Sequence, residues 1–387
     1  MSKKPKVLVI GSGGVGAISA LSLTTNNKSE VTLVVRSDFE LISNNGYSID
    51  SCTYGKLTNW KPHHLAKSVD HATTDFGPFD YILVTTKNVP DGPITCEEII
   101  KPAIKTGNEV IILLQNGLGI ENPMFEAFPN HLILSGVSLI GSTYYHGHVK
   151  NLGKDFVYLG DFKSKQKRSD LSFEKIQKFI EIYQNDDPSK NTILLDEDVQ
   201  KRRWEKLIYN SVFNTISALV QLDNTRIQMT IGNEELILPA MLEVIAIAKS
   251  VGVECDPTLI DKYLHIGDGF FYSPSMCVDV RKGQLMELEI ILGNPMRIAK
   301  ENNVPTPILS TIYPLLKLVQ FRLKEEKKML KLIKMISKEI SMIIKKYFQK
   351  NILLNIRNED VDIDIDRYTY LLRMQEEINI QVFLSLS

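Results

Sequence analysis

Short apolar runs recur through the first half of the chain, separated by helical or turn-rich stretches. Runs rich in Val, Ile and Leu at this length predict buried parallel strands. They lie at residues 6–10, 31–35, 47–53, 80–85, 109–114 and 131–140. Such strands alternating with helices are typical of a doubly wound α/β sheet. The shorter strands and glycine breaks at residues 140–160 predict an antiparallel edge of that sheet.

The hydrophobic pattern changes near residue 195. From there to about residue 330, apolar residues recur at helical spacing in one segment after another. These segments lie at residues 197–221, 233–251, 256–265, 274–300 and 308–330. The predicted fold class is therefore α/β, with an N-terminal Rossmann-type doubly wound sheet over residues 1–195 and an all-α domain over residues 196–325.

Residues 326–387 form a predicted extension of different character. Residues 322–350 hold ten Lys or Arg against three Asp or Glu, with apolar residues at helical spacing, which predicts a basic amphipathic helix. Residues 360–366 alternate acidic and apolar positions, as a strand with one acidic face does. A role at a membrane surface or on a partner is one interpretation. A helix packed on the domain and a poorly ordered tail are the others.

A glycine-rich turn directly follows the first predicted strand. It reads Gly11, Ser12, Gly13, Gly14, Val15 and Gly16. Glycines at this spacing allow a tight turn, a close approach of the backbone to a pyrophosphate, and tight packing of the next helix. That helix is expected to begin near Gly14, with its positive N-terminus facing the phosphates. The turn thus predicts a dinucleotide-binding site.

The end of the second strand indicates which dinucleotide binds. Arg36 stands there, and Asp38 comes two residues later. An acidic residue at this place accepts from the ribose of NAD, whereas an arginine matches the 2′-phosphate of NADP. We therefore expect NADPH/NADP+ as the cofactor. The alternative is a solvated arginine followed by Asp38 as a helix N-cap.

Composition narrows the remaining classes. The 387 residues suffice for two domains, and 45 Lys+Arg against 46 Asp+Glu give a formal net charge of −1. No overall field therefore attracts nucleic acid. The four cysteines are scattered and no His or Cys set has metal-ligand spacing, so no metal site is predicted. No apolar run is long enough to span a membrane, and a strand so near the N-terminus leaves no room for a targeting segment, so the expected location is cytoplasmic.

The first helix after residue 195 carries a polar stripe. Lys206, Asn210 and Asn214 are spaced i, i+4 and i+8, which places them on one helical face between apolar neighbours. Asparagine is a poor helix former, so two on one face require a reason. A stripe of this kind faces a polar cleft or simply solvent.

Further polar residues follow strands or open a helix. Lys87 and Asn116 each come just after a predicted strand, at the carboxyl edge where ligands bind in doubly wound sheets. Ser273 or Ser275 is a candidate helix N-cap, and Asp279 and Glu287 follow it. By themselves these are also ordinary loop charges, caps and solvated acids.

Taken together, these motifs resemble the ketopantoate reductase family over roughly residues 5–320. The resemblance implies that Gly11 to Gly16 and Arg36 bind the cofactor, with Lys87 and Asn116 at its nicotinamide end. It implies that Lys206 is the catalytic acid and that Glu287 orients Lys206 or contacts the substrate. Asn210, Asn214 and Ser275 would bind the substrate, and the role of Asp279 stays structural. Residues beyond about 325 have no counterpart in the common pattern.

The implied activity is NADPH-dependent reduction of 2-dehydropantoate to (R)-pantoate, a step of pantothenate and coenzyme A biosynthesis. The implied partners are a small 2-keto acid and a second copy of the chain in a homodimer. A related NADP-dependent reductase of another small 2-keto acid is the near alternative. A non-catalytic NADP-binding regulatory protein is the distant one.

Overall fold

The computed structural model describes residues 3–162, 170–230 and 232–330. Residues 1–323 form one compact unit and residues 324–387 a second. Most of the predicted basic extension falls on residues 331–387, outside the described residues. Its helix and its acidic strand therefore stay predictions.

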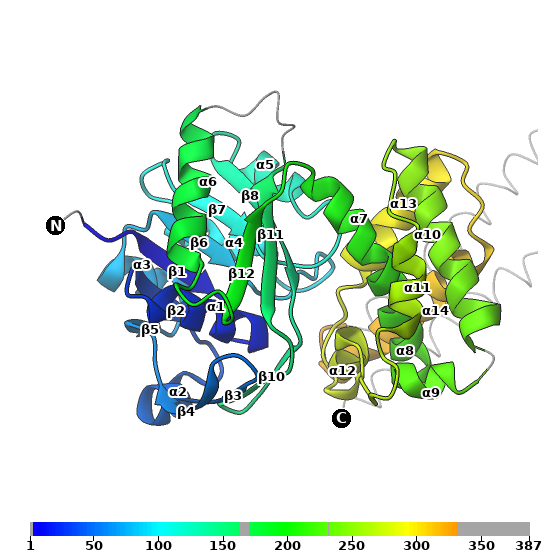
Figure 1. Cartoon of the computed structure of the whole chain (residues 1–387), viewed down its shortest axis with the longest axis horizontal. Coiled ribbons are helices and arrows are strands. Elements are labelled where there is room, and N and C mark those ends of the chain that lie inside the picture. The colour runs from blue at the N-terminus through cyan, green and yellow to red at the C-terminus, as the bar shows by residue number, and fades with distance from the viewer. Residues whose placement is uncertain (1–2, 163–169, 231, 331–387) are drawn as a thin grey trace, which may run out of the picture. The chain divides into compact units, whose positions relative to one another are not determined.

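An eight-stranded sheet forms the first half of the chain (Figure 1). Its order is β12-β11-β8-β7-β6-β1-β2-β5. The strands are β1 (Lys6–Ile10), β2 (Glu30–Val34), β5 (His64–Ala66), β6 (Tyr81–Val84), β7 (Val110–Leu113), β8 (Leu132–Leu139), β11 (Asp155–Asp161) and β12 (Asn191–Leu195). All neighbours pair in parallel except β8 and β11. The doubly wound sheet predicted from the apolar runs is confirmed.

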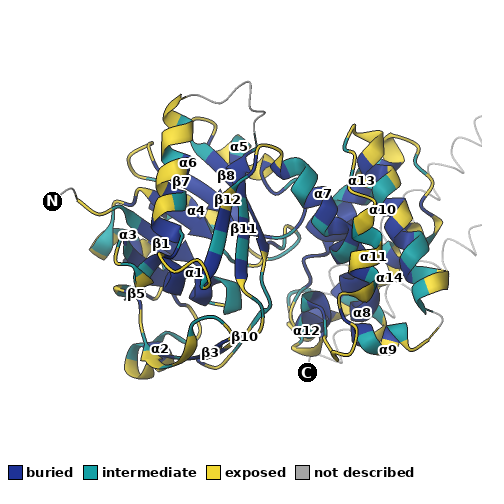
Figure 2. Cartoon of the chain, in the orientation of Figure 1, coloured by how far each residue is buried: buried dark blue, intermediate teal, exposed yellow. Residues whose placement is uncertain are grey.

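Helices cover both faces of this sheet, and alternate residues of β1 show the division. Val7 and Val9 belong to one apolar cluster, which includes residues of α1 (Gly14–Thr25) and α6 (Asp170–Tyr183). Leu8 and Ile10 belong to another, which includes residues of helices on the opposite face. Those helices are α3 (Val69–Phe76), α4 (Cys96–Ile100) and α5 (Asn122–Ala127). Figure 2 shows the buried strands between helices whose outer faces are exposed.

The predicted strand at residues 47–53 is not part of the main sheet but belongs to a second, four-stranded sheet. That sheet also holds the first part of the stretch predicted as an antiparallel edge, while the end of that stretch, β11, lies in the main sheet and pairs antiparallel with β8. The order of the second sheet is β4-β3-β10-β9, from β3 (Tyr47–Ser51), β4 (Gly55–Trp60), β9 (Ser142–Tyr145) and β10 (His148–Asn151). β9 and β10 pair antiparallel as expected, but β10 pairs with β3 and not with the main sheet. The pattern gave no sign of β4, because its side chains are exposed or half-buried and its sequence is mostly polar.

Helices make up the described chain after the last strand, β12 (Figure 1). They are α7 (Val199–Tyr209), α8 (Thr215–Val220), α9 (Asn224–Gln228), α10 (Leu238–Ser250), α11 (Thr258–His265), α12 (Ser275–Arg281), α13 (Asn294–Glu301) and α14 (Pro307–Glu326). Three π-helical segments lie among them: η3 (Asn210–Asn214), η4 (Asn233–Ile237) and η5 (Glu289–Gly293). Two short helices lie earlier in the chain, α2 (Phe39–Asn45) and the 3-10 helix η1 (Lys101–Ala103). The predicted all-α second half is confirmed, while the exact domain boundaries stay predictions.

The single helix predicted over residues 274–300 is divided. α12 ends at Arg281, and Gly283 follows with a φ of +62°, a left-handed conformation that glycine adopts without strain. Helical backbone returns at η5 and continues through α13 without leaving the helical region. Pro295 lies within this continuous helical stretch, just after the π-helical η5, and the backbone stays helical through it.

One apolar cluster joins the sheet to the helices that follow it. It contains Leu8 and Ile10 of β1 together with Trp204, Leu207 and Ile291 from the helical half. The sheet and the helices within residues 1–323 therefore share a continuous core, which fixes the carboxyl edge of the sheet against α7 and η5.

A small polar group is buried beside α1 in the first half. Asp155, 1% exposed, accepts a hydrogen bond of 2.7 Å from the hydroxyl of Tyr183, which also lies 3.0 Å from Oγ of Ser19. Burial raises the pKa of Asp155 to about 6, and its hydrogen bonds only partly oppose that shift. The folded protein therefore binds a proton here more tightly than the unfolded chain does.

We expect Asp155→Asn to remove a pH dependence of stability. The folded-state pKa of Asp155 lies above the unfolded value of about 3.9. The free energy of unfolding of the wild-type protein should therefore fall as the pH rises from about 4 to about 6. The variant should match or exceed the wild type at pH 7.5, by up to about 2 kcal/mol in the free energy of unfolding. Urea unfolding at several pH values measures this. Asp50→Asn, on an exposed residue of β3, is the control, and an equal change in both variants would refute the assignment.

Candidate active site

The glycine-rich turn between β1 and α1 has the geometry of a phosphate cradle. Gly11 has a φ of +114°, and a Cβ there would lie 2.7 Å from Oγ1 of Thr85. A Cβ on Gly16 would lie 1.8 Å from the carbonyl oxygen of Gly11, so this glycine lets α1 pack against the turn. A Cβ on Gly13 would meet no atom within 4 Å. The first and last glycines are therefore required by packing, whereas the backbone at Gly13 is open to a ligand.

Arg36 follows β2 after one buried residue, Val35, and its own side chain is exposed. Asp38 occupies the N-cap position of α2, but its carboxylate makes no capping hydrogen bond. It accepts instead a short hydrogen bond from the hydroxyl of Tyr144 in β9. The acidic residue near this strand end is thus already engaged, and the guanidinium of Arg36 is the charged group presented to solvent.

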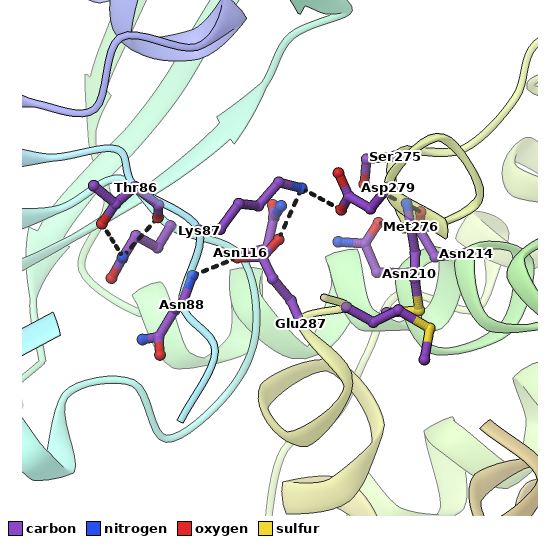
Figure 3. Close-up of polar contacts among 12 residues, drawn as sticks. Thr86, Lys87, Asn88, Asn116, Asn210, Asn214, Ser275, Met276, Asp279 and Glu287 are labelled. Carbon is purple, nitrogen blue, oxygen red and sulfur yellow. Dashed lines mark hydrogen bonds and ion pairs between the residues drawn. The ribbon is translucent and has the colours of Figure 1, made fainter. Parts of the chain in front are cut away.

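Lys87 links the loop after β6 to the helical half (Figure 3). Its Nζ lies 2.8 Å from Oδ2 of Asp279 on α12 and 3.2 Å from Oε2 of Glu287. The other oxygen of Glu287 accepts a hydrogen bond of 2.9 Å from the backbone N–H of Asn88. Burial lowers the pKa of Lys87, but the charges of Glu287 and Asp279 outweigh it and hold that pKa above its ordinary value. Lys87 is therefore a fixed cation at neutral pH.

Lys206 is the second lysine at this edge of the sheet. Its Nζ donates to Oδ1 of Asn116 at 2.8 Å and to the carbonyl of Ser138 in β8 at 2.5 Å. Burial lowers the pKa of Lys206 to about 8, the positive charge of Arg203 adds to that shift, and Glu287 opposes it. A lysine with this pKa holds a proton at neutral pH and releases it readily.

The polar stripe continues from α7 into the π-helical turn η3. Nδ2 of Asn214 donates to Oδ1 of Asn210 at 2.9 Å, so both side chains lie on one face, as the spacing predicts. Oδ1 of Asn214 accepts from the N–H of Met276 at 3.0 Å and from Oγ of Ser275 at 3.2 Å. Asn214 thereby connects the stripe to the start of α12 (Figure 3). α12 begins at Ser275 itself, with Pro274 rather than a serine in the N-cap position.

Hydrogen bonds join the predicted residues into three groups. Lys206 contacts Asn116, Asn214 contacts Asn210 and Ser275, and Glu287 contacts Lys87 as well as the backbone N–H of Asn88. The hydrogen bonds of Glu287 in the described chain do not include one to Lys206, so a direct orienting contact is not seen.

Three residues of the site were not singled out from the sequence. Ser138 offers only its backbone carbonyl and Asn88 only its backbone N–H, for which the side-chain pattern carries no signal. Arg203 lies four residues before Leu207, on the apolar face of α7, and is 3% exposed. A charged residue at an apolar helical position is the signal that indicates it.

The space between these groups is narrow. A cavity of about 10 Å³, the size of one water molecule, is lined by Asn116, Lys206 and Asn210 together with Arg203 and Gly117. A larger cavity of about 440 Å³ opens beside β9 and β10 and is lined also by Val278 and Lys282. It contains none of the predicted site residues. Of the predicted site residues, Asn116, Lys206 and Asn210 line the small cavity.

Within residues 3–162, 170–230 and 232–330, no helix is long and apolar enough to cross a membrane. No three or more His, Cys, Asp or Glu side chains there come together as metal ligands would.

This arrangement suits chemistry at a carbonyl group. An ammonium group of lowered pKa stabilises negative charge that develops on a carbonyl oxygen and then supplies the proton. Amide groups beside it, from Asn210 and Asn214, offer donors to carboxylate or hydroxyl oxygens.

Two family models match the chain in succession. Residues 7–164 match the model described as ketopantoate reductase PanE/ApbA, and residues 198–320 match the model of its C-terminal part. The first range covers the glycine turn and the sheet except for β12, and the second runs from α7 into α14 and includes Lys206 and Glu287.

Relatives extend over nearly the whole described chain. An uncharacterized protein of Saccharomyces cerevisiae is 42% identical over 348 residues, which is 84% of this chain and 96% of the relative. The crystal structure of 2-dehydropantoate 2-reductase from Methylococcus capsulatus is 28% identical with a TM-score of 0.68, over 82% of this chain and 97% of that one. The ternary structure of D-mandelate dehydrogenase with NADH and anilino(oxo)acetate has a TM-score of 0.69 at 19% identity, over 82% and 99% of the two chains, and so shares the fold. From the two family models and these relatives, the chain belongs to the ketopantoate reductase family.

Proposed function

We propose that this protein reduces 2-dehydropantoate to (R)-pantoate with NADPH, a step of pantothenate and coenzyme A biosynthesis. The observation that carries the proposal is the position of Lys206. A lysine of pKa about 8 lies hydrogen-bonded to Asn116 at the carboxyl edge of the sheet, within the family's fold. The proposed setting is the cytoplasm, with the protein as a homodimer.

The residues present fit a nicotinamide dinucleotide. The open backbone at Gly13 and the N-terminus of α1 suit a pyrophosphate, since backbone N–H groups there have no helical partner. Ser12, Gly14 and Val15 complete the turn. The exposed guanidinium of Arg36 suits a 2′-phosphate, which supports NADPH over NADH. Bound at this turn, the cofactor supplies a hydride to the substrate carbonyl carbon.

The protein's own side chains would do the rest. Lys206 holds a proton on Nζ and delivers it to the carbonyl oxygen as negative charge develops there. Asn210, Asn214 and Ser275 hold the carboxylate and hydroxyl oxygens of the substrate. Lys87 and Asn116 line the nicotinamide end of the site. Glu287 keeps Lys87 in place and opposes the loss of the proton from Lys206.

Reduction of a different small 2-keto acid is the second candidate. The observation that favours it is the shared fold with a D-mandelate dehydrogenase, together with an uncharacterized relative at 42% identity. A non-catalytic NADP-binding regulatory protein is less well supported, because a sensor has no need of a lysine of lowered pKa beside the stripe.

The deciding experiment follows NADPH absorbance with purified protein, 2-dehydropantoate and a panel of other 2-keto acids. Turnover confined to 2-dehydropantoate supports the proposal. Turnover of the other acids alone would support the same type of reaction with a different substrate, and therefore a different pathway. No turnover of any acid, despite tight NADPH binding, supports the regulatory alternative.

Lys206→Ala is expected to lower kcat by about 10²–10⁴-fold with the fold intact, because the proton donor is lost. Steady-state kinetics with circular dichroism measure both. In the wild type, kcat should fall as the pH rises through about 8, since Lys206 then loses its proton. Lys201→Ala, a half-buried lysine of the same helix paired with Glu205, is the control. Near-wild-type turnover of Lys206→Ala would contradict the role.

Arg36→Ala is expected to raise KM for NADPH at least about tenfold while KM for NADH changes little, because only NADPH carries the 2′-phosphate. Initial rates with both cofactors measure the ratio. Lys28→Ala removes a charge just before β2 instead of just after it and is the matched control. If both KM values rise equally in Arg36→Ala, Arg36 does not bind that phosphate.

A further inference from the structure

Arg203 is a buried cation without an ion-pair partner among the described residues. Its residue is 3% exposed, and burial lowers its pKa to about 10, so it stays protonated at neutral pH. Its guanidinium packs over the ring of Phe162, 5.2 Å from the ring centre. Burying a charge without a counter-charge is costly unless hydrogen bonds satisfy it. The contacts that satisfy Arg203 therefore indicate what it is for.

All four hydrogen bonds of Arg203 go to the carboxyl edge of the sheet. Nε donates to Oγ of Ser135 in β8 at 2.8 Å, and Nη2 donates to the carbonyl of Leu113 at the end of β7 at 3.3 Å. Nη1 donates to the carbonyls of Gln115 at 3.0 Å and Gly117 at 2.9 Å. These last two acceptors flank Asn116 on either side. The guanidinium thus holds the two peptide groups between which Asn116 projects.

The same residue also fixes the start of the stripe. Lys206 follows Arg203 by three positions, one turn further along α7. Nζ of Lys206 donates to the side chain of that same Asn116. Arg203 therefore holds the backbone on both sides of Asn116. The same helix, α7, carries Lys206, which donates to the side chain of Asn116.

We propose that Arg203 is a positioning residue for the reaction. It joins α7 to the loop after β7, so that Asn116 and Lys206 keep their positions relative to each other, and it places a fixed positive charge beside them. The proposal rests on the proposed function, in which Lys206 is the acid. Arg203 also lines the small cavity, but its hydrogen bonds go to Ser135 and to backbone carbonyls and not to the side chains of Lys206 or Asn116.

The fixed charge of Arg203 acts on Lys206 together with two other groups. Lys87 faces Lys206 from the loop after β6, and Glu287 faces it from the segment before η5. The charge of Lys87 is countered by Asp279 and Glu287, whereas no carboxylate forms an ion pair with Arg203 in the described chain. Among the neighbouring charges that lower the pKa of Lys206, the positive charge of Arg203 has the largest effect.

The test measures the pKa of Lys206 without relying on turnover. Competitive labelling of amines with acetic anhydride at a series of pH values, read by peptide mass spectrometry, gives the protonation midpoint of Lys206 in the full chain. Arg203→Leu should move this midpoint upward by about 1 pH unit, because a repelling charge is removed. Arg202→Leu is the matched control, since it removes the neighbouring arginine, which pairs with Asp196 and Glu205 away from Asn116. Its midpoint should stay at the wild-type value.

Arg203→Lys tests the positioning role and guards against failure of Arg203→Leu to fold. A lysine keeps the charge but lacks the planar guanidinium, whose three nitrogens reach Ser135, Leu113 and the two carbonyls beside Asn116 at the same time. The labelling midpoint should stay near that of the wild type, while kcat on the 2-keto acid that the protein reduces falls at least about tenfold. An unchanged midpoint in Arg203→Leu, an equal shift in Arg202→Leu, or full kcat in Arg203→Lys would overturn the proposal.

The two proposals fail separately. If no 2-keto acid is reduced, the proposed function fails, yet the labelling midpoints still decide whether Arg203 sets the protonation of Lys206. If turnover is found but the midpoints of the wild type and Arg203→Leu agree, the reaction stands and the role of Arg203 does not.

Discussion

The contact between Lys87 and the two carboxylates of Asp279 and Glu287 is the interaction on which the site depends. The lysine belongs to a loop at the sheet's carboxyl edge, and both acids belong to segments of the helical half. A charge pair this close, with one partner almost wholly buried, fixes both segments because separating them would leave Glu287 without its counter-charge. The other polar contacts of the site lie within the frame that this contact maintains.

Within that frame, the protein places two cations of different behaviour near one another. Lys87 keeps its proton because acids surround it, whereas Lys206 gives up its proton near pH 8 because it is buried among amides, a carbonyl and another cation. Two identical functional groups therefore differ through their surroundings alone, which is how a site separates a fixed charge from a transferable proton.

Much of this was predictable from the sequence, for identifiable reasons. The strand and glycine signals of the first half are local, since β1 is apolar throughout and Gly11 and Gly16 meet requirements of one turn. The stripe of Lys206, Asn210 and Asn214 follows from helical spacing. The pairing of Glu287 with Lys87 was not predictable, because the two residues are 200 positions apart and the break after α12 redirects the chain between Asp279 and Glu287. The separate small sheet was missed for a similar reason, since β10 pairs with the distant β3.

The π-helical turn η3 has one more consequence. An α-helix with one additional residue in a turn keeps its axis but rotates everything after that turn by about 100°. Asn210 and Asn214 begin and end this turn, so α7 and α8 present different faces to the core on either side of it. The turn rotates the residues after it about the helix axis. Lys206, before the turn, contacts the sheet, and Asn214, at its end, contacts α12. A chain shorter by a single residue here would turn α8 by about 100° relative to α7 and so move Asn214 away from α12.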